Sequence, residues 1–243
     1  MKVEIWSDFI CPFCYIGKRR FENALKQFGH HDEVEVVYRS FELDPHAPRD
    51  VDHDVYDMVA KKYSMSREKS QGMHDDLTQQ AQAVGLTYRF DTAILTNTFD
   101  AHRLTHFAAK HGKGAQMTER LLKAYFTDSK HIGDPTVLAS LAGELGLDSQ
   151  AVSDMLAGDA YTQEVRADEQ AASDFGARGV PFFVIDRKYG VSGAQSPEVF
   201  LQALHQAWDE AHPKLTFVNE AGSTGTDSAC ADGVCNPAAA EKK

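Results

Sequence analysis

Segments with the sequence pattern of β-strands occur near both ends of this 243-residue chain and are scarce in between. Val3–Trp6 is a short alternating stretch, and Val34–Phe41 is rich in β-branched and aromatic residues. Between these two segments the apolar residues have helical spacing, at Phe21, Ala24, Leu25 and Phe28. A strand, a helix and a strand in succession predict a βαβ unit with a right-handed crossover.

The middle of the chain, from about Asp52 to Phe175, carries helical patterns, and strand patterns resume only at Val180–Ile185 and Tyr189–Ser192. A final apolar stripe with helical spacing ends at Trp208. This order predicts an α/β domain of residues 1–50 and 176–217, into which an all-helical domain of residues 51–175 is inserted. Gly, Ser, Thr, Asp and Ala dominate the start of residues 218–243, so we predict a flexible C-terminal tail there.

The chain contains four cysteines, in two close pairs, Cys11/Cys14 and Cys230/Cys235. Four cysteines are too few for a scaffold held together by disulfides. The N-terminus lacks the features of a secretory signal, and no apolar run approaches the roughly 20 residues that span a bilayer. We therefore expect a cytoplasmic protein without a membrane partner. Because the cytosol keeps thiols reduced, cysteine pairs there are typical of catalytic, redox-sensing or metal sites.

Cys11 lies where the first predicted strand ends and the first helix begins, and Pro12 suits the first helical position. The Cys11 sulfur is then close to unpaired backbone N–H groups and the positive end of the helix dipole, which favour a thiolate. Cys14 follows three positions later on the same side of the helix, within reach for a disulfide. We predict that Cys11 is an exposed nucleophile and Cys14 a more buried resolving thiol, the two groups that disulfide exchange requires.

The cysteine motif, Asp8–Gly17, is accompanied by three further segments, Phe41–Pro45, Asn97–Arg103 and Gly179–Phe183. With these segments the chain resembles, from Lys2 to about Trp208, the DsbA-like branch of the thioredoxin superfamily, and within it the FrnE-like proteins. In that branch a helical domain is inserted between the two halves of a thioredoxin-like fold. The resemblance implies a cytoplasmic thiol–disulfide oxidoreductase or isomerase that acts on protein thiols.

The resemblance also implies roles for individual residues. Pro181 is expected to be a cis proline that faces the cysteine motif. Val180 is expected to offer its backbone to an extended peptide that bears the target cysteine. Phe13, His102 and Arg103 are candidates for lining the substrate groove.

Two comparisons within the branch bear on the chemistry. Pro12-Phe13 separates the cysteines without the histidine of strongly oxidising DsbA enzymes, which argues against strong oxidant character. The branch also contains glutathione-dependent isomerases and transferases that resemble 2-hydroxychromene-2-carboxylate isomerase, and these usually have a serine where this chain has Cys11. Such an isomerase or transferase is one alternative function, and a redox-regulated chaperone is another.

The pair Cys230/Cys235, with four residues between its cysteines, resembles the second redox pair of some FrnE-like members. A flexible tether raises the effective concentration of these thiols near Cys11 and Cys14. We predict that the tail pair relays electrons to or from the main site, or guards it. The alternatives are an idle disulfide hairpin and a zinc site with four thiolate ligands, which the flexible tail disfavours.

The remaining observations concern cofactors and partners. His102 and His106 have a spacing compatible with a metal, but no carboxylate completes the zinc-enzyme motif, so we predict no metal there. Exchange through Cys11 and Cys14 needs no metal or organic cofactor, and we predict none. Acidic residues outnumber basic ones by 36 to 25, and the resulting net charge of −11 argues against a nucleic-acid partner. We expect protein or small-molecule thiols and disulfides as substrates.

Overall fold

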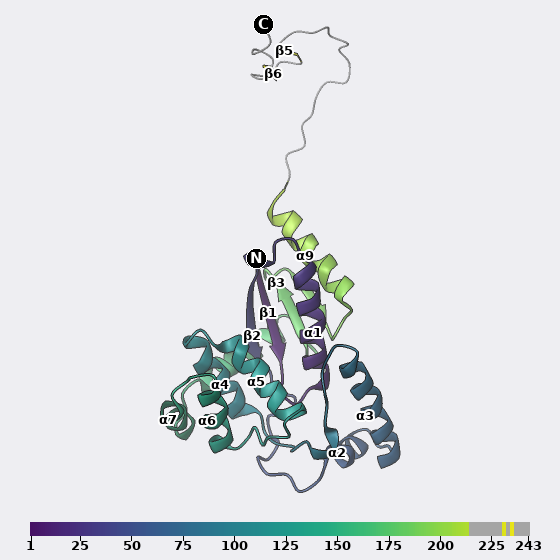
Figure 1. Ribbon diagram of the computed structural model, residues 1–243, viewed down its shortest axis with the longest axis vertical. Coiled ribbons are helices and arrows are strands. Elements are labelled where there is room, and N and C mark those ends of the chain that lie inside the picture. The colour runs from purple at the N-terminus through teal and green to yellow at the C-terminus, as the bar shows by residue number, and fades with distance from the viewer. Residues whose placement is uncertain (214–229, 232–233, 236–243) are drawn as a thin grey trace. The chain divides into compact units, whose positions relative to one another are not determined.

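Two pairs of strands from the ends of the sequence form a four-stranded sheet. In the computed structural model, which describes residues 1–213, 230–231 and 234–235, the strand order is β2-β1-β3-β4 (Figure 1). Strand β1 (Lys2–Ser7) pairs in parallel with β2 (Glu35–Ser40). Strand β3 (Phe182–Ile185) runs antiparallel to both β1 and β4 (Tyr189–Ser192). The predicted strand segments are therefore confirmed, and the sheet joins the two ends of the α/β part.

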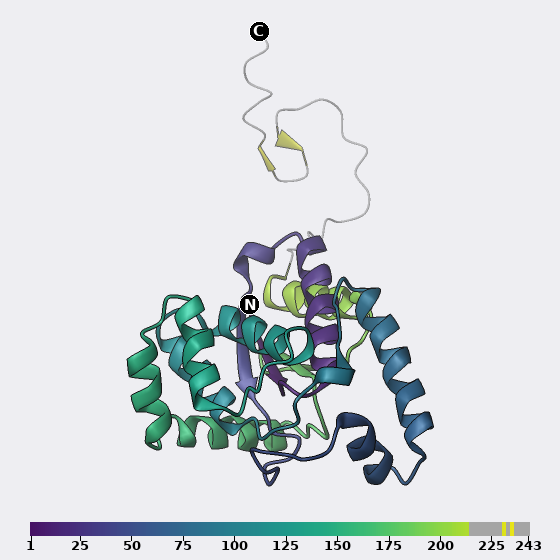
Figure 2. The same cartoon turned by 60° about the horizontal axis from the view of Figure 1, so that its bottom comes forward.

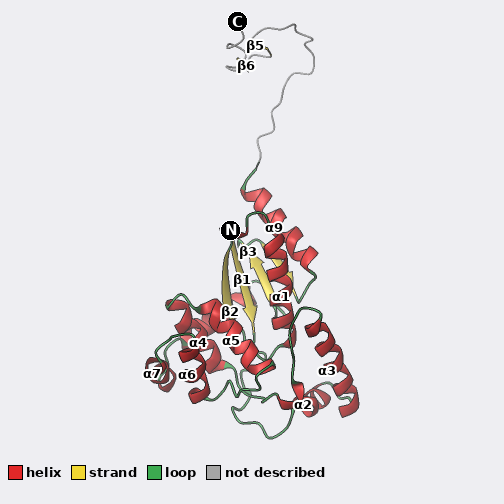
Figure 3. Ribbon diagram, viewed as in Figure 1, coloured by secondary structure: helices red, strands yellow, loops and turns green. Residues whose placement is uncertain are grey.

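Apolar residues alternate between the two faces of this sheet. Val3 and Phe183 belong to the cluster beneath α1 (Pro12–Gln27) and α9 (Pro197–Ala211), which lie side by side on one face (Figures 1 and 3). Trp6 belongs to a second cluster, which it shares with residues of α8 (Thr162–Asp174). Because neighbouring residues of a strand point to opposite faces, the two central strands, β1 and β3, contribute to both clusters.

Seven α-helices follow one another between β2 and β3. Besides α8 they are α2 (Val55–Lys62), α3 (Arg67–Gln82), α4 (Phe99–Lys110), α5 (Gly114–Phe126), α6 (Pro135–Glu144) and α7 (Ser149–Ala157). Four of them begin with a side-chain cap, since Asp54, Ser66, Asp134 and Asp148 each accept a backbone N–H of their own first turn. Helices α4 to α7 gather on the β2 side of the sheet, and α2 and α3 on the α1 side (Figures 1 and 2).

The helices share a core with the end of the sheet that carries the cysteine motif. Phe9, Tyr15 and Ile16 are buried in the same cluster as the apolar residues of α4 to α7. Met1–Trp208 accordingly forms one compact unit, and Asp209–Lys243 is a second unit. The boundaries at residues 50/51 and 175/176 therefore remain predictions.

The C-terminal unit contains the second cysteine pair. Strand β5 (Cys230–Ala231) runs antiparallel to β6 (Val234–Cys235), with Cys230 opposite Cys235 in the register. The rest of the predicted tail, residues 218–229, 232–233 and 236–243, lies outside the described residues. Among the described helices, none combines the length and apolar character needed to cross a membrane.

Candidate active site

Cys11 occupies the junction between β1 and α1, as the sequence predicts. It is the N-cap residue of α1, and Pro12 is the first helical residue. The Cys11 side chain makes no capping hydrogen bond, so the first turn of α1 leaves backbone N–H groups directed toward this end of the helix. These groups and the helix dipole favour negative charge on a sulfur placed here.

Both thiols of the motif are free, and both are buried. Cys14 is 2% exposed, and Cys11 is only 5% exposed. The prediction of an exposed nucleophile is therefore wrong in this structure, since the Cys11 sulfur lies 3.5 Å from the carbonyl oxygen of Val180. Phe13, between the cysteines, is the exposed residue of this turn, with 42% of its surface accessible.

Cys14 has the environment of a resolving thiol. Burial, followed by the neighbouring Cys11, raises the pKa of the Cys14 thiol well above its usual range. Hydrogen bonds from the Ser7 hydroxyl and the Asp8 backbone N–H, the latter at 3.5 Å, lower this pKa but do not outweigh burial. The Cys14 thiol therefore stays protonated until the step in which its sulfur attacks.

The loop before β3 packs against the dithiol. The Val180–Pro181 peptide bond is cis, which confirms the expectation from the resemblance. The Cys11 thiol donates to the Val180 carbonyl, although the two residues are 169 positions apart. This contact places Val180 and Pro181 directly opposite the nucleophile. Their role in positioning a substrate remains a prediction.

Helix α1 approaches this loop closely at Gly17. A Cβ atom added at Gly17 would lie 2.9 Å from Cγ of Pro181 and 3.3 Å from Cβ of Ala194. Both distances are shorter than ordinary carbon contacts. The absence of a side chain at Gly17 therefore lets α1 and the Pro181 loop meet.

We expect Gly17→Ala to destabilise the protein by about 1–3 kcal/mol, because the added methyl group overpacks this contact. Urea unfolding measures the loss. Gly72→Ala is the matched control, since Gly72 lies inside α3 with no atom within 4 Å of an added Cβ. That control should gain up to about 1 kcal/mol from helix propensity alone. Equal effects of the two substitutions would show that the close approach at Gly17 is unimportant.

Tyr88 also reaches the motif, and no sequence pattern indicates it. Its hydroxyl donates to the Pro12 carbonyl at 2.6 Å, across 76 positions of sequence. Tyr88 is buried and stacks on Phe126 of α5. It thereby anchors the first turn of α1 to the helices, a role that only the tertiary structure reveals.

His102 and Arg103 do not line a groove at the dithiol. Arg103, 4% exposed, donates to the backbone carbonyls of Met155, Gly158 and Ala160, where α7 ends. It therefore joins two segments of the helical part. His102 is buried behind the motif, with Nε2 3.4 Å from Oδ1 of Asp8.

The described residues contain no cluster of three or more His, Cys, Asp or Glu side chains that could hold a metal. His106, the partner of His102 in the metal-compatible spacing, instead contacts Ser40 at 3.1 Å and Asp168 at 3.2 Å. The zinc site formed from both cysteine pairs stays untested, because the side chains of Cys230 and Cys235 are not described.

Comparison with known proteins identifies the architecture. A family model for the DSBA-like thioredoxin domain matches residues 2–205. A probable DsbA oxidoreductase from Streptomyces coelicolor, SCO1869, is 48% identical, with a TM-score of 0.84 over 93% of this chain and 97% of that one. The predicted fold class, α/β and thioredoxin-like with inserted helices, is confirmed.

Two further relatives are more distant or uncharacterised. The Bacillus subtilis protein YwbO, described as uncharacterised, is 30% identical over 83% of this chain and 94% of its own length. A 2-hydroxychromene-2-carboxylate isomerase is 16% identical, with a TM-score of 0.65 over 87% of this chain and 98% of its own. At that identity the likeness concerns the fold alone.

Proposed function

Because this chain belongs to the DSBA-like thioredoxin domain family, we propose that it is a thiol–disulfide oxidoreductase that exchanges disulfides with protein thiols through Cys11 and Cys14. One observation carries the proposal: a free dithiol at the N-terminus of α1, with the Cys11 sulfur 3.5 Å from the carbonyl that precedes a cis proline. A nucleophilic sulfur, a resolving sulfur and a peptide-like backbone group meet at one point.

The reaction has two steps. The Cys11 thiolate attacks a substrate disulfide, one substrate thiolate leaves with the electron pair of the broken S–S bond, and a mixed disulfide forms. Cys14 then loses its proton and attacks the Cys11 sulfur. The second substrate thiolate leaves, and the Cys11–Cys14 disulfide remains. Two electrons pass from the protein to the substrate, and the reverse sequence oxidises a substrate dithiol.

The surroundings of Cys11 suit a polypeptide substrate. The Val180 backbone lies beside the sulfur, where an extended chain can pair with it. Phe13 is exposed, and so is Leu43, whose backbone N–H is bound to Asp8 in the motif. Exposed apolar side chains next to a backbone pairing site favour a peptide with apolar residues near its cysteine.

Cys230 and Cys235 are proposed to exchange electrons with this site as a second redox pair. Their opposed register in the β5–β6 ladder brings the two backbones to the separation of paired strands, which suits a reversible disulfide. The flexible tail that the sequence predicts would raise the effective concentration of these thiols near Cys11 and Cys14. Comparing the parent with a Cys230→Ser/Cys235→Ser variant measures the contribution of the tail pair to turnover.

We expect Cys14→Ser, in the Cys230→Ser/Cys235→Ser background, to accumulate a mixed disulfide with a labelled peptide disulfide. Cys11 can still attack, but no resolving thiol releases the peptide. Mass spectrometry should locate the label on Cys11, and dithiothreitol should remove it. The parent should release the peptide and retain at most a trace.

The control combines Cys11→Ser with Cys14→Ser and should carry no label. Full catalytic turnover in the Cys14→Ser protein, together with binding of glutathione, would instead support the glutathione-dependent isomerase or transferase. Suppression of substrate aggregation that is equal with and without Cys11 would support the redox-regulated chaperone.

A further inference from the structure

The second step of the exchange requires a proton acceptor that the dithiol itself does not provide. Cys14 is buried, and its thiol must lose a proton before its sulfur can attack the mixed disulfide. Burial also makes the thiolate costly to form. Direct transfer to bulk solvent is impeded because Cys14 is 2% exposed. The acceptor must therefore be reached from inside the protein.

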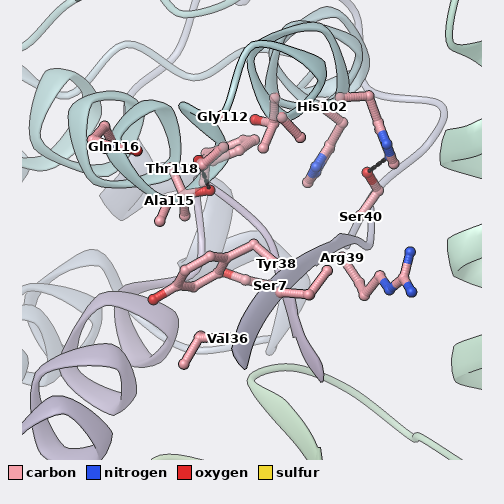
Figure 4. Close-up of a pocket in the computed structure, with 16 residues that line it drawn as sticks. Ser7, Val36, Tyr38, Arg39, Ser40, His102, Gly112, Ala115, Gln116 and Thr118 are labelled. Carbon is pink, nitrogen blue, oxygen red and sulfur yellow. Dashed lines mark hydrogen bonds between the residues drawn. The ribbon is translucent and has the colours of Figure 1, made fainter. Parts of the chain in front are cut away.

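A cavity lined by Ser7 and His102 leads inward from the surface at the turn between α4 and α5. It has a volume of about 260 Å³ and lies between β2 and the helices α4 and α5 (Figure 4). Its lining includes exposed residues at the turn between the two helices, Gly112, Ala115 and Gln116, and buried residues, Ser7, Phe9 and His102. Figure 4 shows Ser7 and Tyr38 of the strands across from His102 and Thr118 of the helices. Since one water molecule takes up about 30 Å³, the cavity has room for several.

The inner end of the cavity is connected to Cys14 through Ser7. Ser7 lines the cavity, and its hydroxyl is close enough to the Cys14 sulfur to lower the pKa of that thiol. A hydroxyl group both donates and accepts hydrogen bonds, so it can receive a proton on one side and pass one on at the other. Ser7 thus joins the buried thiol to the space that His102 also faces.

His102 has an unsatisfied polar atom at this place. Its Nε2 and the Oδ1 atom of Asp8 are both buried, lie 3.4 Å apart, and have no hydrogen-bond partner among the described residues. The other carboxylate oxygen of Asp8 accepts the backbone N–H of Leu43 at 2.7 Å, which fixes the group. Buried polar atoms are rarely left unpaired, and a proton on His102 would place a positive charge 3.4 Å from the Asp8 carboxylate.

We propose that His102, supported by Asp8, accepts the Cys14 proton through Ser7 and water in this cavity. This inference rests on the proposed function and names a proton-relay residue for its second step. The Cys14 S–H bond breaks and the proton moves along the relay to the His102 imidazole. Cys14 forms the S–S bond with Cys11, and the substrate thiolate leaves with the electron pair. The Asp8 carboxylate provides the opposite charge for the imidazolium, which later returns its proton to solvent through the cavity.

Other titratable groups surround the relay and have to be kept constant in a test. Glu42 is buried near His102, and burial raises its pKa, although the ion pair with Arg166 and the nearby His102 lower it. Burial and the charge of Asp8 raise the pKa of Tyr125. On the cavity wall, His106 is already bonded to Ser40 and Asp168, and Arg39 is paired with Glu4 and Asp168. When all variants are compared at the same pH, the protonation of these groups does not change with pH between measurements.

Stopped-flow reaction with Ellman's reagent separates the two steps in the full chain carrying Cys230→Ser and Cys235→Ser. Attack by Cys11 releases one thionitrobenzoate, and attack by Cys14 on the resulting mixed disulfide releases a second. At neutral pH we expect His102→Gln to slow the second release by about tenfold to 100-fold, within the range of general-base effects, and to leave the first unchanged. In His102→Ala, added imidazole should restore the second release.

His74→Gln is the matched control, because His74 is also a buried histidine but lies in α3 and outside the cavity. It should change neither release. Ser7→Ala retains His102 and should slow the second release without affecting the first. This variant tests the proposal if the His102 variants do not fold. An unchanged second release in folded His102→Gln, or slowing of both releases without rescue by imidazole, would overturn the relay. A first release that persists without Cys11 would contradict the proposed function itself.

Discussion

Cys11→Ser is expected to reduce thiol–disulfide exchange by at least about 10³-fold, because a serine hydroxyl at neutral pH cannot replace a thiolate as nucleophile. The substitution changes one atom at a buried N-cap position, so the fold should be retained. Cys14 cannot take over, since it is buried and its thiol has a raised pKa. Turnover of a peptide disulfide with a thiol reductant measures the effect.

The experiment belongs in the Cys230→Ser/Cys235→Ser background, so that the tail thiols do not contribute to turnover. Cys14→Ser is the matched comparison. It should also lose turnover, but it should keep the first, label-accepting step that Cys11→Ser lacks. Exchange that survives Cys11→Ser in this background would show that the motif is not the reaction centre.

Arg103→Met is expected to lower the free energy of unfolding by about 3 kcal/mol or more, without slowing the exchange reaction of the folded molecules. The guanidinium is buried and donates to four backbone carbonyls, those of Met155, Leu156, Gly158 and Ala160. Methionine would fill part of the volume but would remove the guanidinium donor from all four carbonyls, of which those of Met155 and Leu156 are in buried bonds. A loss of this size corresponds to a fall in Tm of roughly 10 °C for a chain of this length.

Arg67→Met is the control for Arg103→Met. Arg67 forms ion pairs with Asp54 and Asp57 on the surface, and such exposed pairs contribute little to stability, so the free energy of unfolding should hardly change. Exchange activity should be measured per folded molecule, well below the lowered Tm. A loss of activity larger than the loss of folded protein would indicate that Arg103 contacts the substrate, as the family resemblance implies.

The local pattern of the sequence accounts for most of the fold. Alternation predicts β1, β-branched and aromatic content predicts β2, and the spacing of Phe21, Ala24, Leu25 and Phe28 predicts α1. Cys11 occupies the N-cap position of α1 without a capping hydrogen bond, and the start of the helix is marked instead by Pro12, which suits the first helical position. Local sequence is therefore sufficient to place the CPFC motif at a helix N-terminus.

Burial cannot be predicted in the same way. The sequence predicts an exposed Cys11, but the Pro181 loop covers it. Arg103 and His102 lie in a segment that resembles the family, and both are buried away from the groove. The sequence alone does not show whether the Arg103 side chain contacts a substrate or backbone carbonyls. Its contacts depend on which distant segment of the chain packs against it.

Periodicity and capping among neighbouring residues are enough to predict the order of strands and helices and the position of the dithiol at the start of a helix. The surroundings of the two sulfurs, in contrast, depend on tertiary packing. Val180 reaches Cys11 across 169 positions, Tyr88 reaches Pro12 across 76, and His102 of α4 reaches Asp8 in the loop after β1. Such contacts arise when separate segments are buried together in one core, and no local pattern records which segments will meet.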